Sequence, residues 1–146
     1  MGILISQRTT TSGQGTRRIF VAGDHALCRE LLVAFLRQFG YETVSVGNGR
    51  DAVLAVGREP FDLALMDIEM PVMDGFGAVA LIRAGEAAGH RLPMIAMSGH
   101  TSEEWRGRVL AAGFDGFLPK PIDFWTFEES ISARLGWKLP RGGRNG

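Results

Sequence analysis

The chain has 146 residues, of which 45% are hydrophobic and 22% are charged, with a single cysteine and a formal net charge of zero. A chain of this length suits one domain, which can bury about two thirds of its unfolded surface. The composition excludes an internal disulfide, and no apolar run approaches the roughly 20 residues of a membrane span, so we expect a cytoplasmic location and no membrane contact by this segment.

The two ends of the chain differ in composition from the part between them. Polar and Gly-rich stretches predict a flexible leader over residues 1–16 and a flexible tail over 138–146, with the folded domain at 17–137. All sixteen acidic residues lie between Asp24 and Glu129, whereas both ends carry arginines. The folded segment is therefore acidic, which argues against direct binding of nucleic acid.

Strand-like and helix-like runs alternate five times along the folded segment. Short apolar runs predict strands at residues 19–22, 42–46, 62–66, 93–97 and 116–118. Helical spacing of apolar residues predicts helices at residues 26–39, 50–57, 76–84, 102–112 and 124–135. Such alternation predicts an α/β fold with a parallel sheet covered by helices on both faces, because parallel neighbours need helical crossovers.

Turn and capping residues support these boundaries. Glycines that favour a left-handed conformation follow three of the predicted helices, at Gly40, Gly113 and Gly136. Residues that can cap a helix stand at or just before the start of three of them, at Asn48, Asp74 and Thr101-Ser102.

The first predicted helix carries six apolar residues at helical spacing, which we expect to pack against the sheet as core. These residues are Leu27, Leu31, Leu32, Phe35, Leu36 and Phe39.

Polar side chains follow four of the predicted strands. Asp24 follows the first strand, Asp67 the third, Ser98 the fourth and Lys120 the fifth. In an open α/β sheet the carboxyl ends of the strands border the crevice where such folds bind ligands. Two carboxylates there can hold Mg²⁺, and a metal ion, a hydroxyl and an ammonium can bind the oxygens of a phosphoryl group that Asp67 attacks.

Three of these residues also have a plainer interpretation. Asp67 by itself suits a turn, and Asp24 by itself suits the cap of the first helix. Lys120 is one of two lysines in an arginine-rich chain, but a single lysine is most often a surface residue. Cys28 has no Cys or His ligand pattern around it and is interpreted as an ordinary thiol.

The combination of segments resembles a known family. The runs LMDIEMPVMDG (65–75), PMIAMSGH (93–100) and FLPKP (117–121), with Gly23-Asp24 and ELL (30–32), resemble the receiver domain of two-component response regulators. The similarity is greatest to receivers of hybrid sensor histidine kinases. It implies a flavodoxin-like, doubly wound (βα)5 fold with five parallel strands in the order 2-1-3-4-5.

The resemblance also implies roles for individual residues. It implies that Asp67 accepts a phosphoryl group from a phosphohistidine of a histidine kinase or a histidine phosphotransfer domain. It implies a Mg²⁺ cofactor held by Asp24, Asp67 and the backbone carbonyl of Glu69. Three further residues match the family's invariant lysine, switch hydroxyl and switch aromatic: Lys120, Ser98 and Phe117.

One position departs from the family pattern. The family has two adjacent acids after the first strand, and this chain has Gly23 in place of the first. One carboxylate fewer predicts weaker Mg²⁺ binding, although Gly23 can instead serve a close backbone approach. Glu69 and His100, each two residues beyond a strand-end residue, are predicted to set the lifetime of the phosphorylated state.

These features favour a signalling module that catalyses only its own phosphorylation and dephosphorylation, alone or within a hybrid kinase, with weak dimerisation on activation. Two alternatives remain. One is a degenerate pseudo-receiver that binds a partner without taking phosphate. The other is a haloacid-dehalogenase-like phosphohydrolase, a family that needs a second Asp two residues after the nucleophile, where this chain has Glu69.

Overall fold

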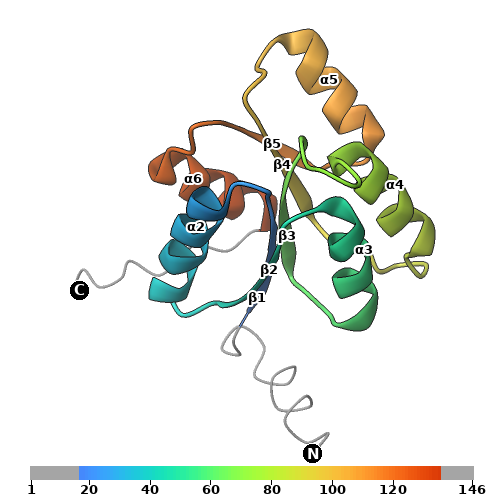
Figure 1. Ribbon diagram of the computed structural model, residues 1–146, viewed down its shortest axis with the longest axis horizontal. Coiled ribbons are helices and arrows are strands. Elements are labelled where there is room, and N and C mark those ends of the chain that lie inside the picture. Colours follow the sequence, from blue (N-terminus) through green and yellow to red (C-terminus); the bar gives the residue numbers. More distant parts are fainter. Residues whose placement is uncertain (1–16, 136–146) are drawn as a thin grey trace, which may run out of the picture.

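The computed structural model describes residues 17–135 (Figure 1). The predicted leader at 1–16, the predicted tail at 138–146 and the predicted helix end at Gly136 lie outside the described residues. The strands are β1 (Arg18–Ala22), β2 (Glu42–Val46), β3 (Leu63–Asp67), β4 (Met94–Ser98) and β5 (Gly116–Pro119). The helices are α2 (Ala26–Gln38), α3 (Gly49–Arg58), α4 (Gly75–Gly85), α5 (Glu103–Ala112) and α6 (Phe124–Leu135).

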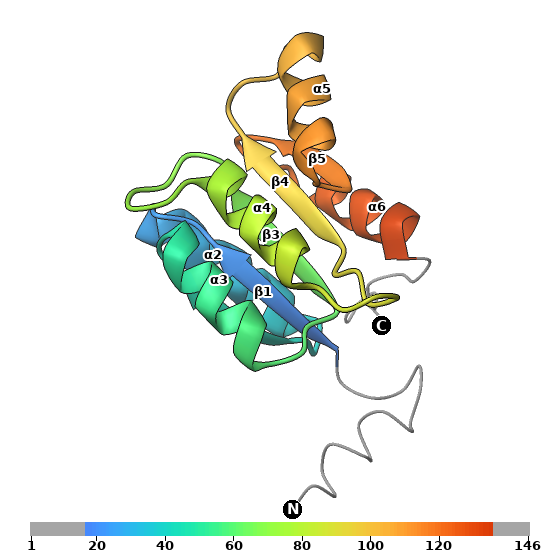
Figure 2. The ribbon, with the colours of Figure 1, turned by 90° about the vertical axis from the view of Figure 1, so that its right-hand side faces the viewer.

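The strands form one parallel sheet in the order β2-β1-β3-β4-β5, as predicted for a flavodoxin-like fold. Helices α2 and α6 cover one face, and α3, α4 and α5 cover the other (Figures 1 and 2). The register pairs Asp67 of β3 with Met97 of β4, and Ser98 of β4 with Pro119 of β5. Within residues 17–135, no helix is long and apolar enough to cross a membrane.

The central strands β3 and β4 are apolar up to their last residues, Asp67 and Ser98, because helices cover both faces of the sheet. All five residues of β3 and all five of β4 are buried. Alternate residues of each strand enter different cores. In β1, Ile19 and Val21 join the core beneath α2 and α6, whereas Phe20 and Ala22 join the core beneath α3, α4 and α5.

The predicted apolar stripe of α2 is only partly correct. Leu32 and Leu36 are buried, but Leu27 and Leu31 are 61% and 55% exposed. The six apolar positions spread over roughly half of the helix circumference, which is wider than the strip that a helix presses against a sheet. The residues at one edge of that arc therefore face solvent, and the expectation that Leu27 and Leu31 belong to the core is wrong.

The predicted caps are confirmed at three helices. Asn48 Oδ1 accepts a hydrogen bond from Asp51 N at 2.8 Å, Asp74 Oδ1 accepts one from Gly77 N at 3.0 Å, and Ser102 Oγ accepts one from Trp105 N at 3.2 Å. Helix α2 is capped differently. Its N-cap is His25, whose ring nitrogen accepts from Cys28 N, so the Asp24 carboxylate does not cap this helix.

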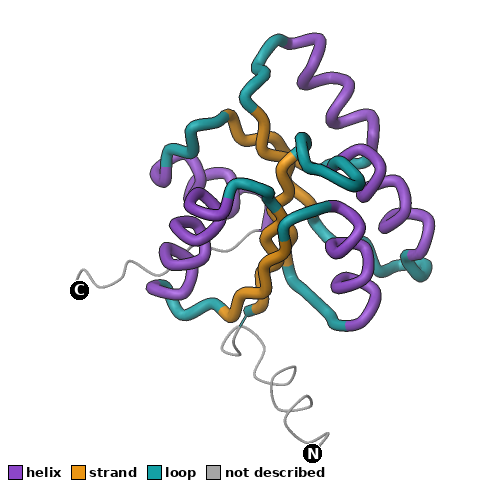
Figure 3. The backbone as a smooth tube through the Cα atoms, in the orientation of Figure 1, coloured by secondary structure: helices purple, strands orange, loops and turns teal. Residues whose placement is uncertain are grey.

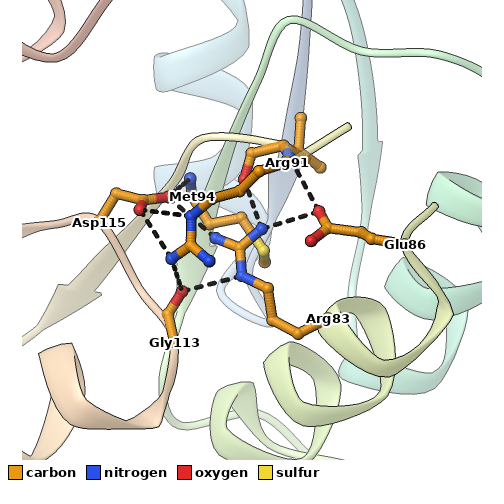
Figure 4. Close-up of polar contacts among 7 residues, drawn as sticks. Arg83, Glu86, Arg91, Met94, Gly113 and Asp115 are labelled. Atoms are coloured by element: carbon orange, nitrogen blue, oxygen red, sulfur yellow. Dashed lines mark hydrogen bonds and ion pairs between the residues drawn. The ribbon is translucent and has the colours of Figure 1, made fainter. Parts of the chain in front are cut away.

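A cluster of charged residues joins α4 to the amino ends of β4 and β5 (Figure 4). The Arg83 guanidinium donates to the Gly113 carbonyl at 3.0 Å, to Glu86 at 2.8 Å and to Asp115 at 2.9 Å. Asp115 also accepts from Arg91 and from the backbone N–H of Met94. This cluster fixes the loops at the end of the sheet opposite to the carboxyl ends of the strands.

Candidate functional site

The structure brings three predicted site residues together at the carboxyl ends of the central strands. Asp67 is the last residue of β3, Ser98 is the last residue of β4, and Lys120 directly follows β5. Loops leave this edge of the sheet towards the helices, at the top in Figure 3. The parallel order places these side chains on neighbouring strands although they are distant in the sequence.

Asp67 and Lys120 form an ion pair at this edge. Lys120 Nζ lies 3.0 Å from Asp67 Oδ1 and 2.9 Å from Oδ2, so it donates to both carboxylate oxygens. The Asp67 side chain is only 7% exposed, whereas that of Lys120 reaches the surface. The peptide bond between Lys120 and Pro121 is cis.

Burial and charge act on the Asp67 carboxyl in opposite directions. Burial raises the pKa of Asp67 above its ordinary value, because a carboxylate loses hydration in the interior. The hydrogen bonds and charge of Lys120 lower this pKa, and the negative charge of Asp24 raises it further. The net direction is upward, so the environment makes the Asp67 carboxylate easier to protonate than a free one.

The loop after β3 approaches Asp67 closely. Gly75 N donates to the Ile68 carbonyl at 2.7 Å. A Cβ at Gly75 would lie 2.8 Å from the Asp67 carbonyl oxygen and 2.9 Å from the Ile68 Cα, contacts that real Cβ atoms do not make. Glycine is therefore required here for the chain to turn from β3 into α4 beside the carboxylate.

The residues next to Asp67 fit a magnesium ion. The Asp24 carboxylate is exposed and close enough to Asp67 to raise its pKa, so the two acids share one region. Among the described residues no three His, Cys, Asp or Glu side chains cluster as metal ligands. Two carboxylates and a backbone carbonyl are nevertheless the hard oxygen donors that Mg²⁺ prefers, because this ion usually takes one or two carboxylates and keeps several waters.

Gly23 leaves room for a Cβ atom beside Asp67. A Cβ at this position would lie 3.6 Å from Asp67 Oδ2, an ordinary contact, and Gly23 is not among the glycines with positive φ. Its carbonyl accepts a hydrogen bond from Arg29 Nη1 at 2.5 Å. The backbone here therefore requires no glycine, which leaves the lost carboxylate as the main consequence of this departure.

Ser98 is buried and its hydroxyl is already engaged. Its side-chain oxygen accepts from the backbone N–H of His100 at 3.1 Å and from the indole Nε1 of Trp105 at 2.9 Å. Sequence reasoning missed Trp105. An aromatic residue in the first turn of a helix is most often core, and only the fold shows that its N–H reaches the end of β4.

The other predicted site residues lie around this group. Glu69 and His100 follow the ends of β3 and β4 by two residues, and Glu69 Oε2 lies 3.3 Å from His100 Nε2 with both side chains largely exposed. Phe117 is half-buried on β5 and packs against the core on the side of α3, α4 and α5. The Arg106 guanidinium of α5 lies 5.1 Å from the centre of the Phe117 ring.

A cavity of about 420 Å³ opens beside Asp67, between α2 and the loop that follows β5. Asp67 and Lys120 line its polar part, and Leu31 of α2 and Phe124 of α6 belong to its apolar wall. We call Leu27, Leu31 and Phe124 the α2 patch, because all three are exposed apolar residues of α2 and of the start of α6. The carboxylate therefore lies next to an apolar surface.

The strand order and the polar residues at the strand ends define a flavodoxin-like α/β domain with its site at the carboxyl edge of the sheet. The sequence model of the response regulator receiver domain matches residues 19–132. The chain thus belongs to the response regulator receiver domain family, as the sequence motifs predicted.

Relatives and solved structures agree with this assignment. The chain is 39% identical over 107 residues to the sensor protein GacS of Pseudomonas syringae pv. syringae, a match of 72% of this chain and 12% of GacS. It is 36% identical to the CAI-1 autoinducer sensor kinase/phosphatase CqsS of Vibrio cholerae, over 73% of this chain and 16% of CqsS. The chain therefore spans a small part of these relatives.

A solved structure supports the fold directly. The receiver domain of the sensor histidine kinase PA1611 from Pseudomonas aeruginosa matches with a TM-score of 0.75 and 30% identity. The match covers 84% of this chain and all of that domain, whose crystal structure has a magnesium ion coordinated in the active-site cleft. The predicted relation to receivers of hybrid sensor kinases is confirmed.

Proposed function

We propose that this receiver domain takes a phosphoryl group from a phosphohistidine onto Asp67 in a two-component phosphorelay. The observation that carries the proposal is the buried Asp67 carboxylate, held on both oxygens by Lys120 beside the open cavity. A nucleophilic carboxylate must be accessible to the donor, and the cavity supplies that access. The ammonium of Lys120 offsets the charge that gathers on the transferred oxygens.

In the proposed transfer, an Asp67 oxygen attacks phosphorus in line with the phosphorus–nitrogen bond of the donor. A phosphorus–oxygen bond forms and the phosphorus–nitrogen bond breaks, and the electron pair stays on the imidazole nitrogen, which takes up a proton. Asp67 must be ionised to attack, so Lys120 counteracts the rise of the Asp67 pKa that burial causes. In dephosphorylation a water attacks the phosphorus and restores the carboxylate, with release of phosphate.

Asp24, Asp67 and the backbone carbonyl of Glu69 would hold Mg²⁺. When bound, this ion supplies positive charge next to the phosphoryl oxygens. Asp24 suits the role because His25, and not Asp24, caps α2. Lys120 directly follows the strand that ends at Pro119 and would contribute a second positive charge beside Asp67.

A histidine kinase or a histidine phosphotransfer domain would approach over the α2 patch. The donor imidazole has to come within bonding distance of a nearly buried carboxylate, so the partner surface must contact the rim of the cavity. Two exposed apolar residues of this patch, Leu31 and Phe124, line the cavity and suit the apolar centre of such an interface. Weak dimerisation on activation stays a prediction.

The test is the mass of the chain after incubation with a phosphorylated histidine donor and Mg²⁺. The natural chain should gain one phosphoryl group, and an Asp67→Asn variant should gain none. Asp74→Asn is the matched control, because Asn also caps a helix and Asp74 lies in the same loop. A phosphorylated Asp67→Asn variant would contradict the assignment of the acceptor.

The same experiment separates the proposal from its alternatives. A natural chain that never gains mass, with phosphate donors or with beryllofluoride, would be a pseudo-receiver that acts only as a binding surface. Release of phosphate from a simple phosphomonoester over many turnovers would indicate a phosphohydrolase. Membership of the receiver family favours the phosphoacceptor over the haloacid-dehalogenase-like reaction.

A further inference from the structure

We propose that Trp105 is the positioning residue of the switch hydroxyl: its indole N–H holds Ser98 in the unphosphorylated state and releases it when Ser98 turns to a phosphoryl group on Asp67. This inference rests on the proposed phosphoacceptor function and names how that site is regulated. Trp105 then carries the change from Ser98 to α5.

The hydrogen bonds of Ser98 are the first step. A serine hydroxyl can accept two hydrogen bonds and donate one. Here both acceptor positions are filled, by His100 N at 3.1 Å and Trp105 Nε1 at 2.9 Å. His100 lies in the loop from β4 to α5, and Trp105 lies in α5. Ser98 is 2% exposed, so water does not compete for the hydroxyl. The bond to Trp105 therefore holds the side chain in one orientation.

Phosphorylation changes the competition for this hydroxyl. A phosphoryl group on Asp67 brings charged acceptor oxygens to the strand next to β4, and hydrogen bonds to charged acceptors are stronger than neutral ones. The Ser98 oxygen moves towards them to bring its free O–H within reach, and this movement takes the oxygen away from the indole N–H. The indole N–H, which can only donate, then loses its acceptor in a half-buried position. An unpaired donor shielded from water is costly, so the half-buried ring shifts until its N–H finds a new partner.

A shift of the Trp105 ring would affect how α5 packs on the rest of the domain. Val109 is the single buried residue of α5, so the half-buried indole is a main attachment of this helix to the rest of the domain. Its ring lies edge-to-face with Phe76 of α4 at 5.5 Å and with His100 at 5.2 Å, measured between ring centres. The Arg108 guanidinium lies 5.1 Å from the indole. Movement of the indole therefore alters the contact between α4 and α5.

The arrangement of the helices agrees with this assignment. Helix α5 stands out from the sheet in both ribbon views, beyond α4 (Figures 1 and 2). Arg106, next to Trp105 in the sequence, covers the Phe117 ring of β5. One helix thus contacts the switch hydroxyl through Trp105 and the predicted switch aromatic through Arg106. The surface that changes on phosphorylation is accordingly that of α5.

The first test follows the indole N–H of Trp105 by NMR in the full chain, which has three tryptophans. Its signal is assigned as the one lost in Trp105→Phe. Beryllofluoride with Mg²⁺ should shift that signal, and Ser98→Ala without beryllofluoride should also shift it, because either change removes the acceptor. Asp67→Asn with beryllofluoride should leave it unmoved. Binding of beryllofluoride, measured by ¹⁹F NMR, with no shift of the Trp105 signal would overturn the inference.

The second test measures energetic coupling between Trp105 and Ser98. Trp105→Phe keeps an aromatic ring but removes the N–H, so the apparent affinity for beryllofluoride should rise about fivefold, as expected from the net strength of one hydrogen bond. In a Ser98→Ala background the same substitution should have no effect. Arg108→Ala, which alters a contact of the ring but not the N–H, is the control and should leave the affinity unchanged.

The outcomes distinguish the two proposals. An equal effect of Trp105→Phe with and without Ser98 would show that Trp105 acts through packing alone, and the inference would be wrong while the phosphoacceptor function stands. A natural chain that binds no beryllofluoride would contradict the proposed function, and the inference that rests on it would fall as well.

Discussion

Asp67, the proposed nucleophile, is a carboxyl group that the fold makes harder to ionise. Its burial excludes water from the carboxylate, and Lys120 returns part of the lost stabilisation through two hydrogen bonds. Because burial is the larger effect, the pKa is raised in the folded protein. Keeping this buried carboxylate ionised for its chemistry therefore lowers the folding stability of the domain.

That cost gives a first prediction, on pH dependence. A carboxyl whose pKa is higher in the folded state binds its proton more tightly there, so stability falls as pH rises from the ordinary value of 3.8 through the folded pKa. Asp67→Asn should therefore raise the free energy of unfolding at neutral pH, by on the order of 1 kcal/mol. Urea denaturation at neutral pH and in mild acid checks it. The gain should shrink in acid, and a constant difference would contradict the explanation.

Gly23 gives a second prediction, on metal affinity. Gly23→Asp adds a carboxylate where the structure has room for a side chain and where φ is not positive. Mg²⁺ should bind roughly tenfold more tightly, because an added charge near the ion strengthens the attraction in a partly desolvated cleft. The control is Gly57→Asp, which adds the same charge on α3, where a Cβ meets nothing within 4 Å. Equal Mg²⁺ titrations of the natural chain and Gly23→Asp would show that Gly23 does not limit affinity.

Glu69 and His100 give a third prediction, on the lifetime of the phosphorylated state. Their side chains lie 3.3 Å apart, two residues beyond the ends of β3 and β4, and we predict that they cover the path by which a hydrolytic water approaches Asp67. Glu69→Ala or His100→Ala should open that path and shorten the lifetime by a few-fold, and the double variant should add little because the two act as a pair. The test is the rate of phosphate loss, followed by mass spectrometry. Thr101→Ala, at an exposed residue next to His100, is the control and should keep the natural rate. Unchanged lifetimes would remove the pair from the mechanism.

At the scale of elements, the sequence predicted those features that depend on local chemistry. Strand and helix alternation, the caps at Asn48, Asp74 and Ser102 and the strand order implied by the family motifs agree with the structure. Features that depend on packing between distant segments were not predictable. The exposure of Leu31 depends on how far the sheet extends beneath α2, and the bond from Trp105 to Ser98 depends on how α5 folds back onto β4.

The charged cluster around Arg83 gives a fourth prediction, on stability. Arg83 is 14% exposed and binds two carbonyls and two carboxylates that join α4 to the amino ends of β4 and β5. Arg83→Met should lower the free energy of unfolding by about 2 kcal/mol, because it leaves partly buried groups unpaired. Arg91→Met, at a 57% exposed residue on the same Asp115, should cost less than about 1 kcal/mol. Urea denaturation compares them, and equal losses would contradict the role of burial.

At the scale of the whole molecule, the two ends of the sheet hold different groups of residues. The Arg83 cluster joins the loops at the amino ends of the strands, whereas Asp67, Ser98 and Lys120 gather at the carboxyl ends. The site therefore includes residues from three separate strand ends, and its parts approach one another only after the sheet has formed. Stabilising contacts at the far end can change without altering the chemistry, so Arg83→Met should leave the rate of phosphorylation intact.

The two layers of helices also differ, which gives the last prediction. The α2 patch borders the cavity at Asp67, while α5 lies on the opposite face of the sheet (Figure 1). If the phosphohistidine partner docks on the α2 patch, Leu31→Gln should slow phosphotransfer from a phosphorylated kinase fragment about tenfold, because an apolar anchor at the centre of an interface is replaced by a polar one. Labelling by acetyl phosphate, a donor too small to need that surface, should stay unchanged.

The matched control is Leu110→Gln, which makes the same change at an exposed leucine of α5. It should transfer phosphate at the natural rate, because the opposite layer does not touch the incoming donor. Rates are compared at partner concentrations below saturation, where a loss of binding appears directly in the transfer rate. Equal slowing by the two substitutions, or slowing of the acetyl phosphate reaction by Leu31→Gln, would show that the effect does not come from docking. Selective slowing by Leu31→Gln would place kinase recognition on the α2 side and leave α5 free to carry the output.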